Sequence, residues 1–151
     1  MMQTDTQFSI FLVNKPGVLA QVCQQLADKK INVVGMSMMD STEHGVLRLV
    51  AEDPKKARRA IAAMGVPSTE TDVLLTKLPN RPGALADVVG RLAQAHINVN
   101  YAYCTTGAAN GKTIGIFKIA DVKKAMKVLA ERKPRRKTAA PVRKRRLIKR
   151  R

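Results

Sequence analysis

Two stretches of the sequence are nearly the same. Residues 12–33 are LVNKPGVLAQVCQQLADKKINV and residues 78–99 are LPNRPGALADVVGRLAQAHINV, and twelve of the twenty-two aligned positions are identical without a gap. Further along, the offset grows from 66 to 68 residues, since Asp53 matches Asp121. The second copy therefore carries two extra residues, which we place in the loop 105–112. A repeat of this length indicates that one small unit occurs twice in the chain.

The first half of each copy predicts a strand followed by a helix. Residues 8–13 form a short apolar run typical of a strand, and an Asn-Lys-Pro-Gly turn follows it. Apolar residues then recur every three or four positions, which predicts one buried helix face. In the first copy these residues are Leu19, Val22, Cys23, Leu26 and Ala27. We therefore expect Cys23 to be a small core residue.

The second half of each copy predicts two strands, a helix and a last strand. In the first copy the strands are expected at 31–39 and 46–51. The pair Asp53-Pro54 is a typical helix start, and Gly65 ends that helix. Residues 66–71 add a short strand. The second copy has no evident last strand, because a basic segment follows its final helix directly.

This order of elements predicts an α+β fold, with two tandem ferredoxin-like βαββαβ units that each place helices on one face of an antiparallel sheet. We assign unit 1 to residues 7–70, unit 2 to residues 72–131 and a basic tail to residues 132–151. The chain has 151 residues, which is enough for two such small units.

The positive charge is concentrated in the tail. The chain holds 28 Lys or Arg against 11 Asp or Glu, a net charge of +17. Twelve of the basic residues and no acid lie in 132–151, which leaves 16 − 11 = +5 for the rest. With almost no apolar residues, the tail is expected to be disordered. It could bind nucleic-acid phosphates, bind an acidic protein or anionic membrane, or only add solubility. The residues expected to contact a polyanion are Arg135, Arg136, Lys137, Arg143, Lys144, Arg145 and Arg146.

Several function classes find no support in the sequence. No apolar run approaches the roughly 20 residues that span a bilayer, and the N-terminus lacks a secretory pattern, so we expect a cytoplasmic protein without a transmembrane segment. His44 and His96 have no metal-ligand or triad neighbours, and Cys104 is expected to be structural. We therefore expect no enzyme activity, no metal and no cofactor. The glycine-bearing loop 107–112 is followed by a strand, so it is a hairpin and not a phosphate loop.

An RNA-binding sheet surface is also disfavoured. Sheets that read single-stranded RNA stack bases on aromatic side chains. Only 3% of this chain is aromatic, and no matching signature is present. Tyr101 and Tyr103 alternate onto one strand face, where we expect them to pack or to cover an effector.

The repeated Asn-x-Pro-Gly loops are the candidate binding sites. Each lies between a strand and a helix, where N–H groups at the helix start suit a carboxylate. Gly17 and Gly83 let a ligand approach the backbone, and an Asn amide can accept from an ammonium group. These groups match a free amino acid. The same four residues also form a good turn without any ligand.

The loop, followed fourteen residues after its glycine by Ile-Asn-Val, resembles ACT domains, which are small ferredoxin-like modules that bind amino acids and regulate amino-acid metabolism. The resemblance covers about residues 7–131 as two copies. It implies that units pair side by side with effectors at the seam, either within the chain as an eight-stranded sheet or as a homodimer. The implied amino-acid-binding residues are Asn14, Pro16, Gly17, Val18, Leu19 and Asn32, with Asn80, Pro82, Gly83, Ala84, Leu85 and Asn98.

The resemblance also bears on the ligand and the role. Leu12 and Leu78 stand where a serine-binding ACT domain has a histidine, which favours a less polar effector such as a branched-chain amino acid. The implied function is a non-enzymatic regulatory protein that passes effector occupancy to a partner in amino-acid metabolism. Two alternatives stay open: a nucleic-acid-associated protein whose ACT units dimerise or sense, and a regulatory subunit of a biosynthetic enzyme such as acetolactate synthase.

Overall fold

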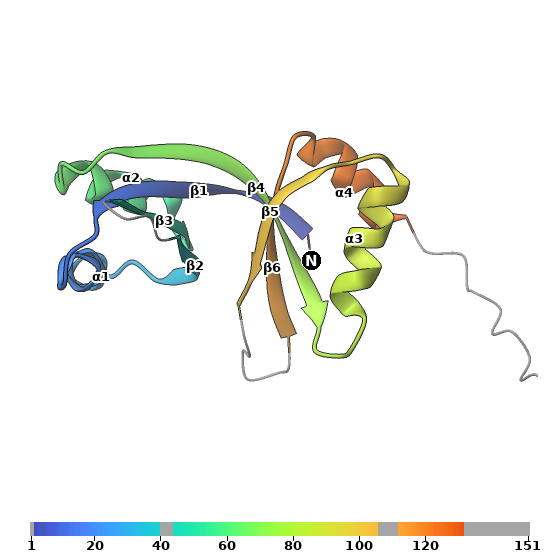
Figure 1. Ribbon diagram of the computed structural model, residues 1–151, viewed down its shortest axis with the longest axis horizontal. Helices are drawn as coiled ribbons and strands as arrows, with labels where there is room; N and C mark the ends of the chain where they lie inside the picture. Colours follow the sequence, from blue (N-terminus) through green and yellow to red (C-terminus); the bar gives the residue numbers. More distant parts are fainter. Residues whose placement is uncertain (1, 40–43, 106–111, 132–151) are drawn as a thin grey trace, which may run out of the picture.

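The computed structural model describes residues 2–39, 44–105 and 112–131 and shows two α+β units built on one antiparallel sheet (Figure 1). The basic tail lies outside the described residues. The elements, in chain order, are β1 (Met2–Val13), α1 (Val18–Asp28), β2 (Val33–Met39), β3 (His44–Ala51), α2 (Pro54–Ala63), β4 (Ser68–Pro79), α3 (Ala84–Gln94), β5 (Val99–Cys104), β6 (Lys112–Ile119) and α4 (Val122–Ala130).

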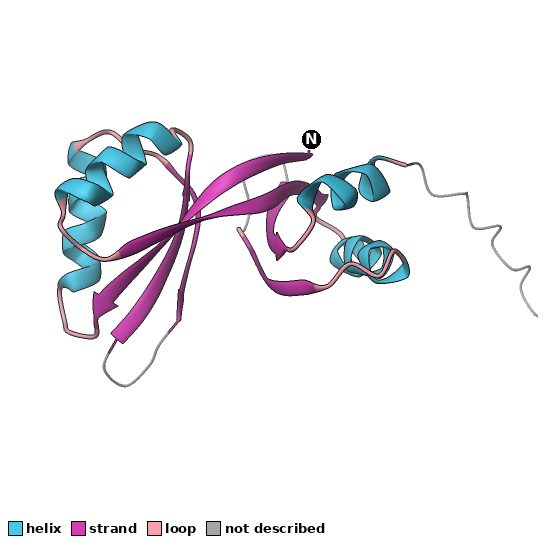
Figure 2. Cartoon of the chain, turned by 90° about the horizontal axis from the view of Figure 1, so that it is seen from above, coloured by secondary structure: helices cyan, strands magenta, loops and turns pink. Residues whose placement is uncertain are grey.

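The sheet has six strands in the order β2-β3-β1-β4-β6-β5. The alternative of an internal eight-stranded sheet is therefore wrong, because the units do not meet through their outer strands. They meet through β1 and β4, two twelve-residue strands that each serve both units. Figure 2 shows the result, with helices at the two far ends and the strands between them.

The first residues of the chain supply the strand that unit 2 lacks. Residues 7–13 of β1 pair with β3 of unit 1, whereas residues 2–6 pair with β4 alone. The second half of β4 pairs with β6. Residues 2–6 thus take the place of a last strand of unit 2, and the expected first strand was too short at its N-terminal end.

The pairing of β1 with β4 has an internal twofold symmetry. Thr6 pairs with Asp72, and on either side Asp5 pairs with Val73 and Gln7 with Thr71. Since the repeat offset is 66 residues, Thr6 and Asp72 are equivalent positions, and the pseudo-twofold axis passes between them. The equivalent outer strands β2 and β5 also share an irregularity, a register shift between residues 33 and 35 and between residues 99 and 101.

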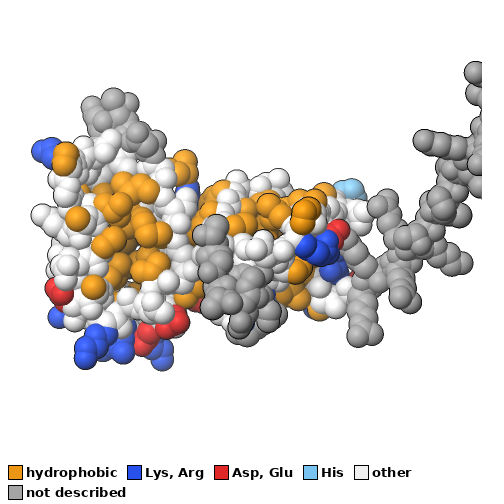
Figure 3. Space-filling model, turned by 90° about the horizontal axis from the view of Figure 1, so that it is seen from below, with side chains coloured by type: hydrophobic (Ala, Val, Ile, Leu, Met, Phe, Trp, Pro, Cys, Tyr) orange, Lys and Arg blue, Asp and Glu red, His pale blue; other side chains and the backbone are white. Residues whose placement is uncertain are grey.

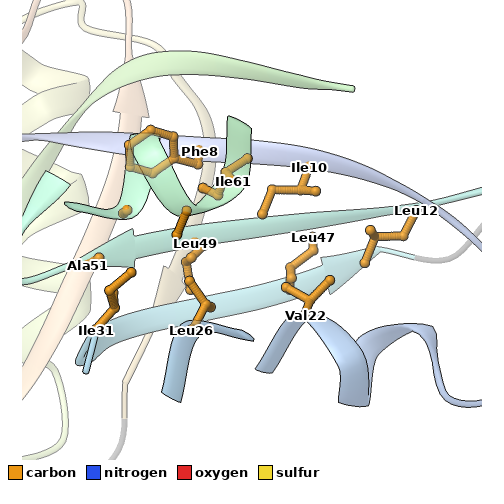
Figure 4. Close-up of a cluster of buried hydrophobic side chains, with 12 residues drawn as sticks. Phe8, Ile10, Leu12, Val22, Leu26, Ile31, Leu47, Leu49, Ala51 and Ile61 are labelled. Atoms are coloured by element: carbon orange, nitrogen blue, oxygen red, sulfur yellow. The ribbon is translucent and has the colours of Figure 1, made fainter. Parts of the chain in front are cut away.

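Each unit buries its helices against its own half of the sheet. In unit 1 the alternating residues of β1 and β3 meet α1 and α2 (Figure 4). The buried side chains include Phe8, Ile10, Leu12, Val22, Leu26, Leu47, Leu49 and Ile61. As predicted, Asp53 caps α2, accepting a hydrogen bond from the backbone N–H of Lys56 (3.0 Å). Its repeat equivalent Asp121 caps α4 in the same way, accepting from the backbone N–H of Lys124 (2.8 Å).

The prediction that Cys23 is a small core residue was wrong. Its side chain is exposed, although it follows the apolar periodicity of α1. Only Val22 and Leu26 of that helix are fully buried. The sheet is too narrow to bury this side of α1. Because β2 is an edge strand, no further strand lies beyond it for that side of the helix to pack on.

The helix-free faces of the two units pack on each other and form a third core. Val50, Val73, Leu75 and Ile116 are buried there, from β3, β4 and β6. Gly35 of β2 lies so close to unit 2 that a Cβ atom would stand 2.6 Å from Ile116 Cδ1. Here the absence of a side chain permits the contact between the units.

Two tyrosines of unit 2 complete this junction. Gln7 Nε2 donates to Tyr101 Oη (2.8 Å), and Tyr103 Oη donates to Gln7 Oε1 (3.1 Å). The guanidinium carbon of Arg48 lies 4.1 Å from the centroid of the Tyr101 ring. Burial raises the pKa of Tyr103, which keeps its hydroxyl protonated as a donor. The tyrosines therefore have the packing role that was expected as one alternative.

Candidate functional site

The two Asn-x-Pro-Gly loops begin α1 and α3 in the same unusual way. Gly17 (φ 87°) and Gly83 (φ 83°) stand at the helix N-caps in the left-handed conformation, which favours glycine. The N-cap residue of each helix is a glycine and supplies no side-chain cap, in contrast to the aspartates that cap α2 and α4. The starts of α1 and α3 are thus suited to a carboxylate, through their N–H groups and the helix dipole.

The loop of unit 1 lines a hollow of about 510 Å³, which we call the loop hollow. Its walls hold five of the expected residues, and Met38 of β2 closes it from the side. The expected residues in it are Asn14, Pro16, Gly17, Val18 and Leu19. Leu12, which is buried, also contributes to the wall. Polar groups of a loop therefore stand beside apolar side chains.

Asn32 lies in a different hollow. This groove hollow, of about 270 Å³, is lined by Cys23 and Ala27 of α1 and by Val33 and Met36 of β2. It shares no lining residue with the loop hollow. The structure therefore does not bring Asn14 and Asn32 of unit 1 together in one hollow.

The two hollows lie along one exposed apolar surface, the α1/β2 groove. Met36 and Met38 of the edge strand are 43% and 40% exposed, and each lines one of the two hollows. Figure 3 shows hydrophobic side chains gathered over this part of unit 1. Sequence reasoning missed Met36 and Met38 as site residues, although two apolar residues at alternate positions of one strand indicate a common face.

The loop of unit 2 has a different charge environment. Arg81 Nη2 pairs with Asp87 Oδ2 at 3.0 Å, and Arg81 Nη1 donates to the Pro82 carbonyl oxygen (3.3 Å). In unit 1 the equivalent of Asp87 is Gln21, and among the described residues Lys15 forms no ion pair.

The other expected site residues of unit 2 are mostly at the surface. Asn80, Pro82, Gly83, Leu85 and Asn98 are exposed, whereas Ala84 is buried. The two loops thus share their backbone conformation and differ in charge.

The remaining candidate residues form no other cluster. Within residues 2–39, 44–105 and 112–131, no group of three or more His, Cys, Asp or Glu could hold a metal ion. His44, His96 and Cys104 are exposed. No helix in the same part of the chain is long and apolar enough to cross a membrane. The seven expected polyanion contacts, from Arg135 to Arg146, lie outside the described residues.

Comparisons with solved structures find the same architecture elsewhere. Protein BT0572 from Bacteroides thetaiotaomicron matches with a TM-score of 0.78 and 32% identity, over 85% of this chain and 88% of that one. The ligand-free regulatory subunit of aspartate kinase from Thermus thermophilus matches with a TM-score of 0.63 and 16% identity, over 85% and 90%. The corresponding subunit from Thermus flavus has a TM-score of 0.58 and 18% identity, over 86% and 94%.

No curated protein matches the chain. At 16–18% identity, the two Thermus proteins show a shared fold. The family model described as an ACT domain pair matches residues 3–137, which is most of the sequence. That span includes both Asn-x-Pro-Gly loops and all of β1 except Met2. The chain therefore belongs to the ACT domain pair family.

Proposed function

We propose that this protein is a non-enzymatic regulator that binds a free amino acid in the loop hollow of unit 1. The observation that carries the proposal is the position of the hollow at the uncapped start of α1, between Asn14 and Met38. Among the described residues, unit 1 also keeps Lys15 without an ion pair. The loop of unit 1 is therefore the stronger of the two candidate sites.

The hollow suits each part of an amino acid. The ligand carboxylate would take the start of α1 and the charge of Lys15. The ammonium group would donate to the side-chain oxygen of Asn14. An apolar side chain would lie against Leu12 and Met38, which supports an effector such as a branched-chain amino acid.

A second copy of the chain would complete this site. Residues 33–39 of β2 contain no charged residue and no proline, which are the usual protection of an edge strand. Antiparallel pairing of two β2 strands about Met36 would set Val33 of one copy opposite Met39 of the other. Asn32 of the second copy would then approach the loop hollow of the first. The exposed apolar surface of the α1/β2 groove favours such a homodimer.

The fold supports a regulatory role. Regulatory subunits of aspartate kinase share the architecture of this chain at low identity. We infer that ligand at the seam favours one arrangement of the paired units and that a partner in amino-acid metabolism responds to it.

A thermal-shift panel of the twenty amino acids tests the proposal. An effector at 100 times its Kd adds about 2.7 kcal/mol to the free energy of unfolding and raises Tm by several degrees. Asn14→Ala should reduce the shift by removing the contribution of the loop hollow, and Asn100→Ala, at an exposed asparagine outside both hollows, should preserve it. No shift with any amino acid at millimolar concentration would refute the proposal.

The seam has a separate test. Met36→Asp places a charge in the middle of β2 and should convert the dimer into a monomer in sedimentation experiments. The monomer should bind the effector more weakly, because it lacks the second Asn32. Undiminished binding by a monomeric variant would remove the second copy from the site.

The charge of residues 132–151 favours a second candidate function, binding to nucleic acid through phosphates. Twelve basic residues and no acid stand in these twenty positions. Such binding would fall with salt at a log–log slope of about −0.7 to −0.9 per phosphate neutralised. Full-length protein should be retained on DNA or RNA more strongly than a chain ending at Glu131. Equal retention would exclude the tail as a binding segment.

A further inference from the structure

A third hollow, separate from both hollows of the α1/β2 groove, opens where the two units meet. This junction hollow measures about 230 Å³. Gln3 and Asp5 of β1 and Glu52 after β3 line it from the N-terminal half of the chain, and Lys77 of β4 lines it from the other half. Its apolar walls are Val34, Leu75 and Ile114.

The β2 irregularity helps to shape this hollow. Val34 is the residue at which the β2 register shifts, so that it is not paired in the regular ladder with β3. Such bulges redirect side chains and are frequent beside functional sites. Val34 and Ile114 pack against the third core, and Leu75 is 5% exposed. The hollow therefore has a firm apolar floor with charged groups at its rim.

The charges at the rim do not neutralise one another. Among the described residues, no ion pair joins Lys77 to Asp5 or Glu52. Asp5 accepts from Gln3 Nε2 (3.2 Å) and from the backbone N–H of Thr6 (2.8 Å), which fixes its carboxylate. Two acidic residues and one lysine thus line the same small space, and within the described part of the chain no ion pair joins them.

The pseudo-twofold symmetry provides an internal comparison. The symmetry-related place has the same backbone irregularity, with Asn100 in the position of Val34. Offsets of 66 and 68 residues put Thr71 in the place of Asp5, Ala120 in that of Glu52 and Phe11 in that of Lys77. None of these residues is charged. The fold itself therefore does not require the three charges, which stand at only one of two equivalent places.

We propose that the junction hollow binds a small zwitterion, a molecule that carries a protonated primary amine and a carboxylate on an apolar skeleton. The amine would pair with Asp5 and Glu52, the carboxylate with Lys77, and the skeleton would lie on Val34, Leu75 and Ile114. Both α-amino acids and ω-amino acids have this chemistry. Because the ligand would contact both units, its binding would stabilise the junction between them.

Calorimetric titration of full-length Asn14→Ala protein tests the proposal, because this variant removes the contribution of the loop hollow to binding. The probes are L-leucine for an α-amino acid, 6-aminohexanoate for an ω-amino acid, and n-pentylamine, which lacks the carboxylate. We expect at least one zwitterion to bind with Kd below about 10 mM and n-pentylamine to bind at least about fivefold more weakly. The zwitterion with the lower Kd identifies the spacing of charges that the hollow accepts.

Variants assign the binding to the hollow. Glu52→Gln and Lys77→Met change exposed side chains and should each raise the zwitterion Kd about fivefold, the upper end for an exposed ion pair. Asp72→Asn is the control for Glu52→Gln. It also replaces an acid by its amide, lies on the same sheet but outside the hollow, and should leave the zwitterion Kd unchanged. Unfolding curves without ligand confirm that each variant is folded.

Three results would overturn the proposal. They are no zwitterion binding to the Asn14→Ala protein, unchanged Kd in both Glu52→Gln and Lys77→Met, and equal affinity for n-pentylamine. The first of these, together with binding to the unmodified protein, would leave the loop hollow as the amino-acid site. Conversely, zwitterion binding that persists in Asn14→Ala and is weakened by Glu52→Gln supports the junction hollow as a binding site, even if the loop hollow binds no amino acid.

Discussion

The hydrogen bonds of Gln7 connect the two units, and a double-mutant cycle measures what they contribute. The Gln7 side chain is 0% exposed. It donates to Tyr101 Oη (2.8 Å) and Ser9 Oγ (3.2 Å) and accepts from Tyr103 Oη (3.1 Å). Gln7→Met keeps the length of the side chain and removes all three bonds. At a net value of about 1 kcal/mol each, we expect the free energy of unfolding to fall by about 3 kcal/mol.

The partner variant, Tyr103→Phe, removes one of these bonds. It should lower the free energy of unfolding by about 1–2 kcal/mol, because the buried Gln7 oxygen loses its donor. In the double variant this bond is lost only once. The sum of the single effects should therefore exceed the double effect by about 1 kcal/mol, within the usual range for contacting residues.

Urea unfolding followed by far-UV circular dichroism measures the four free energies. Gln25→Met, at an exposed position of α1, is the matched control and should change stability by less than about 0.5 kcal/mol, alone or with Tyr103→Phe. If the effects of Gln7→Met and Tyr103→Phe add within about 0.3 kcal/mol, the bond between the units contributes nothing. The tyrosines would then act through packing alone.

Three further predictions concern the same architecture. Gly35→Ala should lower the free energy of unfolding by about 1–3 kcal/mol, because its Cβ would lie 2.6 Å from a buried side chain, whereas Gly90→Ala, in open space on α3, should raise it by about 0.5–1 kcal/mol in urea unfolding. Burial raises the pKa of Tyr103 above its ordinary 10.0, so the unfolded chain loses this proton at a lower pH than the folded chain. The free energy of unfolding, measured as a function of pH, should therefore fall as pH rises above about 10, and it should fall less in Tyr103→Phe. Deleting residues 2–6 should reduce hydrogen-exchange protection in α3 and α4 more than in α1 and α2, and equal loss in both pairs would contradict the assignment of that segment to unit 2.

The repeat predicted the two units well, because turn residues and helix caps are local signals. Asp53 and Asp121 cap their helices through contacts within three residues, so the sequence alone indicates them. Residues 2–6 carry no such signal. They are mostly polar, and their strand depends on pairing with Asp72–Thr76, far along the chain. A strand defined by a distant partner is not visible in its own composition.

The sequence predicted the local structure of the loop at the candidate site, but not which other residues lie around it. The Asn-x-Pro-Gly pattern indicated the turn and the helix start, because both depend on adjacent residues. Periodicity wrongly made Cys23 a core residue, because it could not give the width of the sheet beneath α1. For the same reason it could not show that Asn14 and Asn32 lie in separate hollows, or that Met38 closes one of them.

The shared strands restrict how a ligand at one place can affect another. β1 runs from the junction hollow at Asp5 to the loop hollow at Asn14, about 30 Å at 3.3 Å per residue. A slip of β1 along β4 by one residue would turn buried Phe8 to the opposite face, so this pairing is fixed. A movement between the units that keeps this pairing would be a rotation about the β1–β4 ribbon, and it would change the close approach of Gly35 to Ile116. A ligand that favours one rotation at either hollow must change affinity at the other by the same factor, because coupling between two binding sites is reciprocal.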